Sequence, residues 1–289
     1  MKIYSSNSFA NVYRDSLQDL LNKPEFTASP RGFDIKENLN VTLEITNPLL
    51  STYDNNRRGS QDKYIAAELL WYFAGRNDVE YITKYAKFWE SIQNEDGTVN
   101  SAYGNLIFTE RNEYMYNQYG WALESLSRDK DSRQAVLHFN KPSHQWPRNR
   151  DFVCTMYGIF HIRNNKLDFT VTMRSNDAIL GTPTDIAFFT CLQQQMLSHL
   201  QVLKYPDLEL GKYTHIMNSY HIYDKHFELV EEMLTEEFKE IEFPTLEADL
   251  ILPSGNPSNT LMTFIENDSD ISKVKSKDAL FGWIKNQLL

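Results

Sequence analysis

Residues 153–200 read VCTMYGIFHIRNNKLDFTVTMRSNDAILGTPTDIAFFTCLQQQMLSHL, and this stretch decides the fold. Its first part is rich in strand-forming residues on both sides of Arg163-Asn164-Asn165-Lys166, where paired asparagines tolerate the positive φ of a tight turn. The pattern predicts a hairpin of two strands, over 153–162 and 167–173. A largely apolar stretch with proline near its start then predicts a long buried helix over 183–200.

The flanking sequence mixes strands and helices without strict alternation. Further strands are predicted over 40–45, 134–139 and 212–217, and helices over 63–75, 224–236 and 278–288. A second helix is expected to start at the cap residue Asp78 and to turn Val79, Ile82, Ala86, Trp89 and Ile92 inward. The mixture indicates an α+β fold with one large sheet. The turn-rich stretches 23–30 and 252–259 are short, so we expect one domain over 1–289.

Composition excludes several classes of protein. The chain has 29 Lys and Arg against 39 Asp and Glu, a net charge of −10, which disfavours nucleic-acid binding. No apolar run approaches the roughly 18 residues of a membrane span. Residues 1–10 lack an apolar signal core, so we expect a cytoplasmic protein without a membrane partner. Cys154 and Cys191 are too few for a disulfide framework or a four-cysteine zinc site, and no metal is expected.

Side chains that could bind a ligand or take part in catalysis gather between Cys154 and His226. This region supplies a thiol, an arginine–serine pair, two carboxylates, two histidines and a tyrosine. Arg174 and Ser175 suit a phosphate, because guanidinium and hydroxyl groups donate to its oxygens. On residue chemistry alone, Arg174 could equally pair with Asp177, and Cys154 could be a buried structural thiol.

The segment MRSNDAILGTPTDIAFF, residues 173–189, resembles the signature of thymidylate synthases and related pyrimidine-nucleotide hydroxymethylases. Further blocks resemble the family in the same order: AELLWYFAG, SAYG, DSRQ, DFVCT and THIMNSYHIY. The blocks span roughly residues 31–226, about two-thirds of the chain, whereas the expected helical region 227–289 matches poorly. The resemblance implies a three-layer α+β fold with one large mixed sheet, paired back to back in a homodimer.

The resemblance implies catalytic roles for Cys154, Glu68, Tyr103 and Asp185. Cys154 is expected to add to C6 of the pyrimidine, with nearby Arg174 lowering the pKa of its thiol. Glu68 lies among apolar neighbours on its helix, so its pKa should be raised for proton transfer, and Tyr103 is expected to assist.

The resemblance also implies the binding residues. Arg174 and Ser175 are expected to hold the substrate phosphate, Arg133 to reach it from the partner subunit, Arg31 to act from a mobile loop, and His221 and Tyr223 to hold the 3′-hydroxyl. Asp177, Trp89 and Gly181 are expected to contact the co-substrate 5,10-methylenetetrahydrofolate. Gln134 replaces the second arginine of the family's pair, which puts the partner's contribution at that position in doubt.

Simpler explanations exist for four of these residues. Glu68 could be a solvated helix glutamate, Trp89 a core tryptophan, His221 a structural histidine and Asp185 a helix cap. Cys191 lies inside an apolar helix and is assigned to the core.

Asp185 is the most diagnostic residue for the substrate. The resemblance implies that ordinary thymidylate synthases have an asparagine at this position. Its side chain accepts from N3–H of uracil and donates to O4. Cytosine reverses that pattern, which a protonated aspartic acid matches, as does an ionised aspartate if cytosine N3 takes the proton. Phage deoxycytidylate hydroxymethylases have aspartate at this position. Asp185 therefore predicts a cytosine nucleotide, dCMP.

Other departures point to hydration in place of reduction. Thr155 and Met173 replace a histidine and a glutamine of the synthases, and the C-terminal NQLL does not resemble their closing tail. A less sealed site favours water as the final nucleophile. The predicted product is 5-hydroxymethyl-dCMP. The alternatives are thymidylate synthase or a hydroxymethylase acting on dUMP, a cytidylate C5-methyltransferase, a CMP hydroxymethylase, and an inactive nucleotide- or RNA-binding regulator on the same fold.

Overall fold

One large mixed sheet organises the protein. The computed structural model describes residues 1–246, 250–267 and 269–289. The strand order is β1-β3-β9-β7-β6-β5, with β2 paired to β3 and β8 to β9. The pairs β1–β3 and β7–β9 are parallel, whereas β3–β9 and β6–β7 are antiparallel. The strands are β1 (Lys2–Ser6), β2 (Phe26–Ala28), β3 (Ile35–Ile45), β5 (Val136–His138), β6 (Thr155–Arg163), β7 (Lys166–Met173), β8 (Asn176–Asp177) and β9 (Glu209–Tyr223).

Helices and one small sheet complete the described structure. The small sheet pairs β4 (Thr52–Asp54) with β10 (Lys239–Ile241). The α-helices are α1 (Phe9–Asn22), α2 (Asp62–Phe73), α3 (Phe88–Ile92), α4 (Gln118–Arg128), α5 (Thr182–Leu203), α6 (Phe227–Leu234), α7 (Asn259–Glu266) and α8 (Ala279–Leu288). Short 3₁₀ turns cover Pro30–Gly32, Ile82–Lys84, Pro142–His144, Asp224–His226 and Ile271–Lys273, and a π-turn covers Asn105–Thr109.

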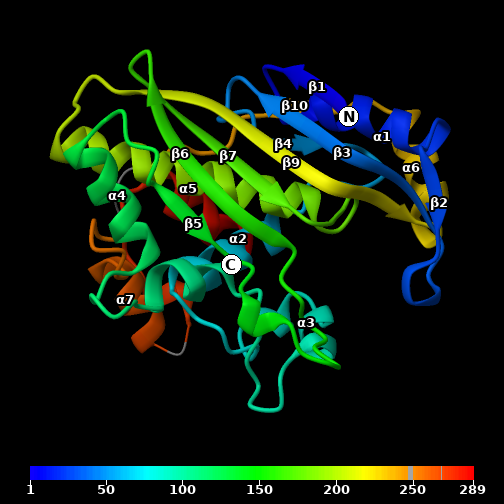
Figure 1. Ribbon diagram of the computed structural model, residues 1–289. Helices are drawn as coiled ribbons and strands as arrows, with labels where there is room; N and C mark the ends of the chain where they lie inside the picture. The colour runs from blue at the N-terminus through cyan, green and yellow to red at the C-terminus, as the bar shows by residue number, and fades with distance from the viewer. Residues whose placement is uncertain (247–249, 268) are drawn as a thin grey trace.

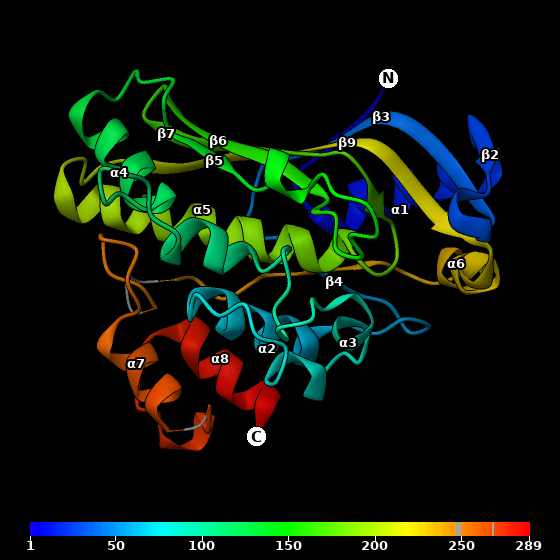
Figure 2. The same ribbon diagram turned by 60° about the horizontal axis from the view of Figure 1, so that its bottom comes forward.

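The elements form three layers, as the resemblance implies. Figure 1 shows the long strands β9, β7 and β6 side by side with α5 behind them. Figure 2 shows α5 and α1 directly beneath one face of the sheet, with α2, α7 and α8 in a further layer below. Because α5 lies between the sheet and this lower layer, most of its side chains are buried. Helix α8 packs against α2, so the C-terminal region supports the helix that carries Glu68.

The hairpin and the central helix agree with the prediction. Asn164 and Asn165 adopt φ values of 49° and 60°, the left-handed conformation expected of this turn. The predicted helix over 183–200 is α5, and Cys191 lies fully buried within it. Helix α2 ends before Gly75, whose φ of 67° favours glycine.

The prediction of one helix from Asp78 to Ile92 is wrong. Its first part is a 3₁₀ turn, and only α3 is helical near Trp89. Arg76 donates to both Asp78 carboxylate oxygens at 2.8 and 2.6 Å, and the Asp78 backbone forms a bridge with Thr98. The expected capping carboxylate is therefore held in an ion pair, and the chain at that point is extended. The sequence patterns also missed β1, α1 and α4.

Candidate active site

The register of the hairpin brings the thiol and an arginine together. Thr155 of β6 pairs with Met173 of β7, so Cys154 and Arg174 are neighbours at the end of the paired strands. The Arg174 backbone N–H donates to the Cys154 carbonyl oxygen at 2.9 Å, and its Nη2 lies 3.4 Å from Sγ. The antiparallel pairing therefore holds a guanidinium beside the sulfur.

The Arg174 side chain is fixed on the segment that leads into β6. Its Nε donates to the Val153 carbonyl oxygen at 3.1 Å, Nη2 donates to the Phe152 carbonyl oxygen, and the guanidinium lies over the Phe152 ring. Asp177 instead accepts two backbone N–H groups of the turn that follows it, at 2.7 and 3.0 Å. Among the described residues no ion pair joins Arg174 to Asp177, so that alternative is wrong.

The pKa of the Cys154 thiol is raised. Burial is the largest cause, Asp185 and Asp151 add to the rise, and Arg174 and Arg31 oppose it. Arg174 thus lowers the pKa as expected, but desolvation of the thiolate outweighs the guanidinium charges, so the pKa of the thiol is raised on balance. The neutral thiol is the resting form near pH 7.

Glu68 is a buried acid held by tyrosines. Burial raises its pKa to about 8, and the Asp185 charge adds to the rise. Hydrogen bonds from Tyr64, Tyr72 and Thr184 act in the opposite direction. The Tyr64 hydroxyl donates to Oε1 at 2.7 Å and the Tyr72 hydroxyl at 3.4 Å. Glu68 is therefore protonated near pH 7 and is not a solvated helix glutamate.

Asp185 lies inside α5, facing the same site. Gly181 is the N-cap of α5, so the explanation of Asp185 as a helix cap is wrong. Burial raises the pKa of Asp185 to about 7, while hydrogen bonds with Asn176 and Tyr103 oppose the rise. Asn176 Nδ2 donates to Asp185 Oδ2 at 2.7 Å. At neutral pH this carboxyl group can therefore exchange a proton with a ligand.

Tyr103 is buried between aromatic rings next to these acids. Its ring stacks on Tyr72 and Phe189 at centroid distances of 5.1 and 5.6 Å. Asp151 accepts the Ser101 backbone N–H at 2.7 Å and the Ser101 hydroxyl, which ties the SAYG segment to the chain entering β6. Burial raises the pKa of Tyr103 far above its usual value, with Asp185, Cys154 and Glu68 contributing less.

A second group of expected residues lies where β8 pairs with β9. This pairing sets Asp177 opposite His221. Burial lowers the pKa of His221, so its imidazole is neutral at pH 7, and its ring meets Tyr223 edge to face at 5.1 Å. Arg31 is exposed in the turn before β3 with a φ of 57°, and its charge acts on the Cys154 thiol.

Trp89 is both a core residue and a member of the hydrogen-bond network of Glu68. It is buried, and its ring meets Trp71 at a centroid distance of 4.9 Å. Its Nε1 donates to the Tyr64 hydroxyl oxygen at 3.1 Å, and Tyr64 in turn bonds Glu68. Trp89 therefore acts on the acid through Tyr64.

Three expected binding residues occupy different surroundings. Ser175 is half-buried after Arg174, and Arg133 is exposed in the segment before the edge strand β5. A Cβ added at Gly181 would lie 2.9 Å from Asn176 Nδ2 and 3.3 Å from Asp185 Oδ2. The glycine thus leaves room for the Asn176–Asp185 pair.

Sequence reasoning missed Tyr64, Asp151 and Asn176. Tyr64 lies four residues before Glu68, a helical spacing that places both on one face and could have revealed it. Asp151 stands three residues before Cys154, within the quoted DFVCT block. Asn176 lies within the quoted segment 173–189, but its partners come from α5 and β9, so its contacts were not visible in the sequence.

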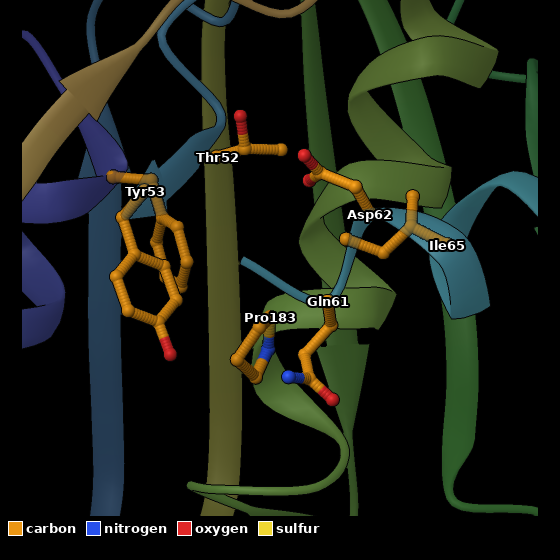
Figure 3. Close-up of a pocket in the computed structure, with 7 residues that line it drawn as sticks. Thr52, Tyr53, Gln61, Asp62, Ile65 and Pro183 are labelled. Carbon is orange, nitrogen blue, oxygen red and sulfur yellow. The ribbon is translucent and has the colours of Figure 1, made fainter. Parts of the chain in front are cut away.

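A small cavity lies at the start of α5. It is lined by Thr52, Tyr53, Asp62, Ile65 and Pro183, from β4, α2 and the start of α5 (Figure 3). Its volume is about 10 Å³, room for roughly one water molecule.

The residues that the structure describes contain no group of three or more His, Cys, Asp or Glu side chains placed to hold a metal ion. They also contain no helix long and apolar enough to cross a membrane.

Known proteins share this fold or align with much of this sequence. The thermostable thymidylate synthase A of Bacillus subtilis matches with a TM-score of 0.66 at 22% identity, over 83% of this chain and 87% of that one. The deoxyuridylate hydroxymethyltransferase of Bacillus phage SP01 is 32% identical over 233 residues, 77% of this chain and 59% of that protein. The deoxycytidylate 5-hydroxymethyltransferase of Enterobacteria phage T4 is 32% identical over 176 residues, 59% of this chain and 70% of that protein.

The match to a family model covers more of this chain than the match to any of these three proteins. The thymidylate synthase model matches residues 13–276, and so includes most of the C-terminal region where the resemblance was poor. The predicted family and the three-layer mixed-sheet fold are thus confirmed. Because the match covers most of the sequence, this chain belongs to the thymidylate synthase family.

Proposed function

We propose that this protein transfers a one-carbon unit to C5 of dCMP and hydrates it, giving 5-hydroxymethyl-dCMP. The observation that carries the choice of base is buried Asp185, whose carboxyl group has a pKa of about 7. In its protonated form it offers one donor and one acceptor, the pattern that N3 and the N4 amine of cytosine require. The phage relatives include enzymes named for each base, so their names leave the choice to this residue.

Cys154 is the proposed nucleophile. Its sulfur adds to C6 of the base, which makes C5 nucleophilic. The raised pKa of the thiol means that its proton must leave as the sulfur attacks. A substrate phosphate seated on Arg174 and Ser175 would hold the base beside Sγ, since Arg174 Nη2 is 3.4 Å from the sulfur.

Glu68 and Tyr103 are the proposed proton-transfer groups. With a pKa of about 8, Glu68 holds a proton near pH 7 and can exchange it with the base or with water. Tyr103 lies close enough to Asp185 and Cys154 for their charges to act on it. Loss of the C5 proton, addition of water to the exocyclic methylene and departure of Cys154 complete the reaction.

The proposed co-substrate is 5,10-methylenetetrahydrofolate, which supplies the one-carbon unit and leaves as tetrahydrofolate. The residues present fit it in part. Asp177 is half-buried, with one oxygen holding its own turn, so its other oxygen can accept from an amine of the pterin. Trp89 bonds Tyr64, the partner of Glu68, and Gly181 lies beside Asp185. Both are proposed to shape the part of the site that takes the folate.

A homodimer belongs to this proposal. Among the described residues no helix covers the second face of the sheet in Figure 2, which leaves it open to another copy of the chain. We propose that Arg133 of one copy reaches the phosphate in the other, while Arg31, His221 and Tyr223 contact the nucleotide within one chain. The phage relatives support placing this reaction in the cytoplasm of a phage host.

A dUMP hydroxymethyltransferase is the second candidate, because the SP01 enzyme of that name aligns with 77% of this chain. The test is mass spectrometry of the nucleotide after incubation with 5,10-methylenetetrahydrofolate, with dCMP, dUMP and CMP in separate tubes. A hydroxymethyl group gained by dCMP alone supports the proposal. Modification of dUMP alone overturns the assignment of Asp185, and a methyl product overturns the hydration step.

A further inference from the structure

Behind Asp185 runs a buried chain of hydrogen bonds. Asn176 Nδ2 donates to Asp185 Oδ2 at 2.7 Å. Asn176 Oδ1 lies 2.6 Å from the Thr182 hydroxyl and 3.2 Å from His215 Nε2, and His215 Nδ1 lies 2.7 Å from the Tyr213 hydroxyl. The five side chains come from β8, α5 and β9, and all are buried.

The direction of donation along this chain is set at its Asp185 end. Burial lowers the pKa of His215 to about 3, so its ring is neutral and carries one N–H. An ionised Asp185 can only accept, so Asn176 must present its amide nitrogen to Asp185 and its oxygen to His215. His215 then donates from Nε2, and its Nδ1 accepts the Tyr213 hydroxyl. With Asp185 ionised, Asn176 and His215 thus each have one role, while the Thr182 hydroxyl lies within reach of both Asn176 Oδ1 and the Asp177 carbonyl oxygen.

This chain decides which oxygen of Asp185 can carry a proton. Oδ2 already receives the Asn176 N–H, and a proton on Oδ2 would point at that donor. The proton therefore belongs on Oδ1. A carboxyl group with Oδ2 as acceptor and Oδ1–H as donor matches the N4 amine and N3 of cytosine. Uracil has N3–H and O4 at these positions, so both contacts would be mismatched.

We propose that Asn176, oriented by Thr182 and His215, is a positioning residue that sets the selectivity for cytosine over uracil by directing the Asp185 proton to Oδ1. The inference rests on the proposed function, in which Asp185 contacts the base. The close approach of Gly181 supports it, because a Cβ there would lie within 3.3 Å of both Asn176 Nδ2 and Asp185 Oδ2. A larger residue at position 181 would therefore disturb the Asn176–Asp185 hydrogen bond.

The substitution Asn176→Asp tests this with almost no change of shape. The new carboxylate would accept from Thr182 and His215 and stay ionised, so Asp185 would have to donate to it from Oδ2. Oδ1 would then be an acceptor, which suits N3–H of uracil and opposes N3 of cytosine. Asn218→Asp is the matched control, because Asn218 lies on β9, the strand that pairs with β8, but is exposed and bonds Asn40.

The measurement is the dissociation constant of dCMP and of dUMP by isothermal titration calorimetry, with circular dichroism to verify folding. The preference for dCMP over dUMP should fall by about 10- to 100-fold in Asn176→Asp and stay unchanged in Asn218→Asp. Thr182→Val, which removes one donor to Asn176 and keeps the volume, should reduce the preference by a smaller factor. It carries the test if Asn176→Asp does not fold.

The outcomes separate this inference from the proposed function. A folded Asn176→Asp, or in its absence Thr182→Val, that keeps the full preference for dCMP overturns the role of Asn176. A wild-type chain that binds dUMP more tightly overturns both the inference and the choice of dCMP. A wild-type chain that selects dCMP in binding, loses this selectivity in Asn176→Asp and hydroxymethylates neither nucleotide contradicts the proposed reaction alone.

Discussion

The Tyr64 hydroxyl donates a hydrogen bond of 2.7 Å to Glu68 Oε1 from one turn earlier in α2. Trp89 donates to the same hydroxyl oxygen at 3.1 Å, so α3 helps to orient the donor. The bond favours the ionised form of a carboxyl group whose pKa burial raises to about 8. Tyr64 therefore limits how far burial shifts the proton affinity of Glu68.

Replacing Tyr64 by Phe should raise the pKa of Glu68 further. The substitution removes the strongest hydrogen bond to the carboxylate and leaves the helix and the apolar contacts intact. The limb of the pH–rate profile that reports ionised Glu68 should move to higher pH. Tyr4→Phe is the control, because Tyr4 bonds Asp19 in the N-terminal region. A profile that does not move would separate Tyr64 from the acid.

Replacing Cys154 by Ala should abolish turnover and leave nucleotide binding measurable. The sulfur is the proposed nucleophile, whereas Arg174 keeps its contacts to the Phe152 and Val153 carbonyl oxygens without it. Mass spectrometry of the product and of a trapped protein adduct provides the measurement. Cys191→Ala, in the buried core of α5, should retain the adduct and lose stability. Turnover near the wild-type rate in Cys154→Ala would contradict a covalent mechanism.

Replacing Asp185 by Asn should shift the preference from dCMP toward dUMP. An amide accepts from N3–H and donates to O4 of uracil, and it cannot supply a proton to N3 of cytosine. The ratio of kcat/KM for the two nucleotides should change by several orders of magnitude. A variant that keeps the wild-type ratio would show that another residue recognises the base.

The buried acids predict that stability falls as the pH rises from about 6.5 to 8. The pKa values of Glu68 and Asp185 rise to about 8 and about 7 on folding, from 4.5 and 3.8. The folded chain therefore binds more protons, and the stabilisation present at low pH is lost as the pH rises through the folded pKa values. Buried His215 has the opposite effect, but mainly below its ordinary pKa of 6.5.

Urea unfolding at several pH values in this window provides the measurement. Each acid should contribute a slope of at most about 1.4 kcal/mol per pH unit. Glu68→Gln should reduce the decline, whereas Glu231→Gln, at an exposed position on α6, should leave it unchanged. Equal slopes in wild type and Glu68→Gln would show that the Glu68 pKa is not raised.

Local patterns predicted the elements that depend on near neighbours in sequence. Paired Asn164 and Asn165 predicted the hairpin because their positive φ values, 49° and 60°, suit its turn. The apolar run after Pro183 predicted α5. The helix expected after Asp78 failed because Arg76 holds that carboxylate and the backbone pairs with Thr98. A capping residue predicts a helix only where nothing else binds its side chain.

By itself, the sequence determined the family and the mixed α+β architecture, and it predicted most of the candidate site residues, because these depend on residue types in a fixed order. Tertiary structure decided their protonation. The Cys154 thiol has a raised pKa despite Arg174, because burial depends on how strands and helices enclose it. The orientation of Asn176 toward Asp185 likewise depends on His215, 39 residues away along the chain, and only the pairing of β8 with β9 brings them together.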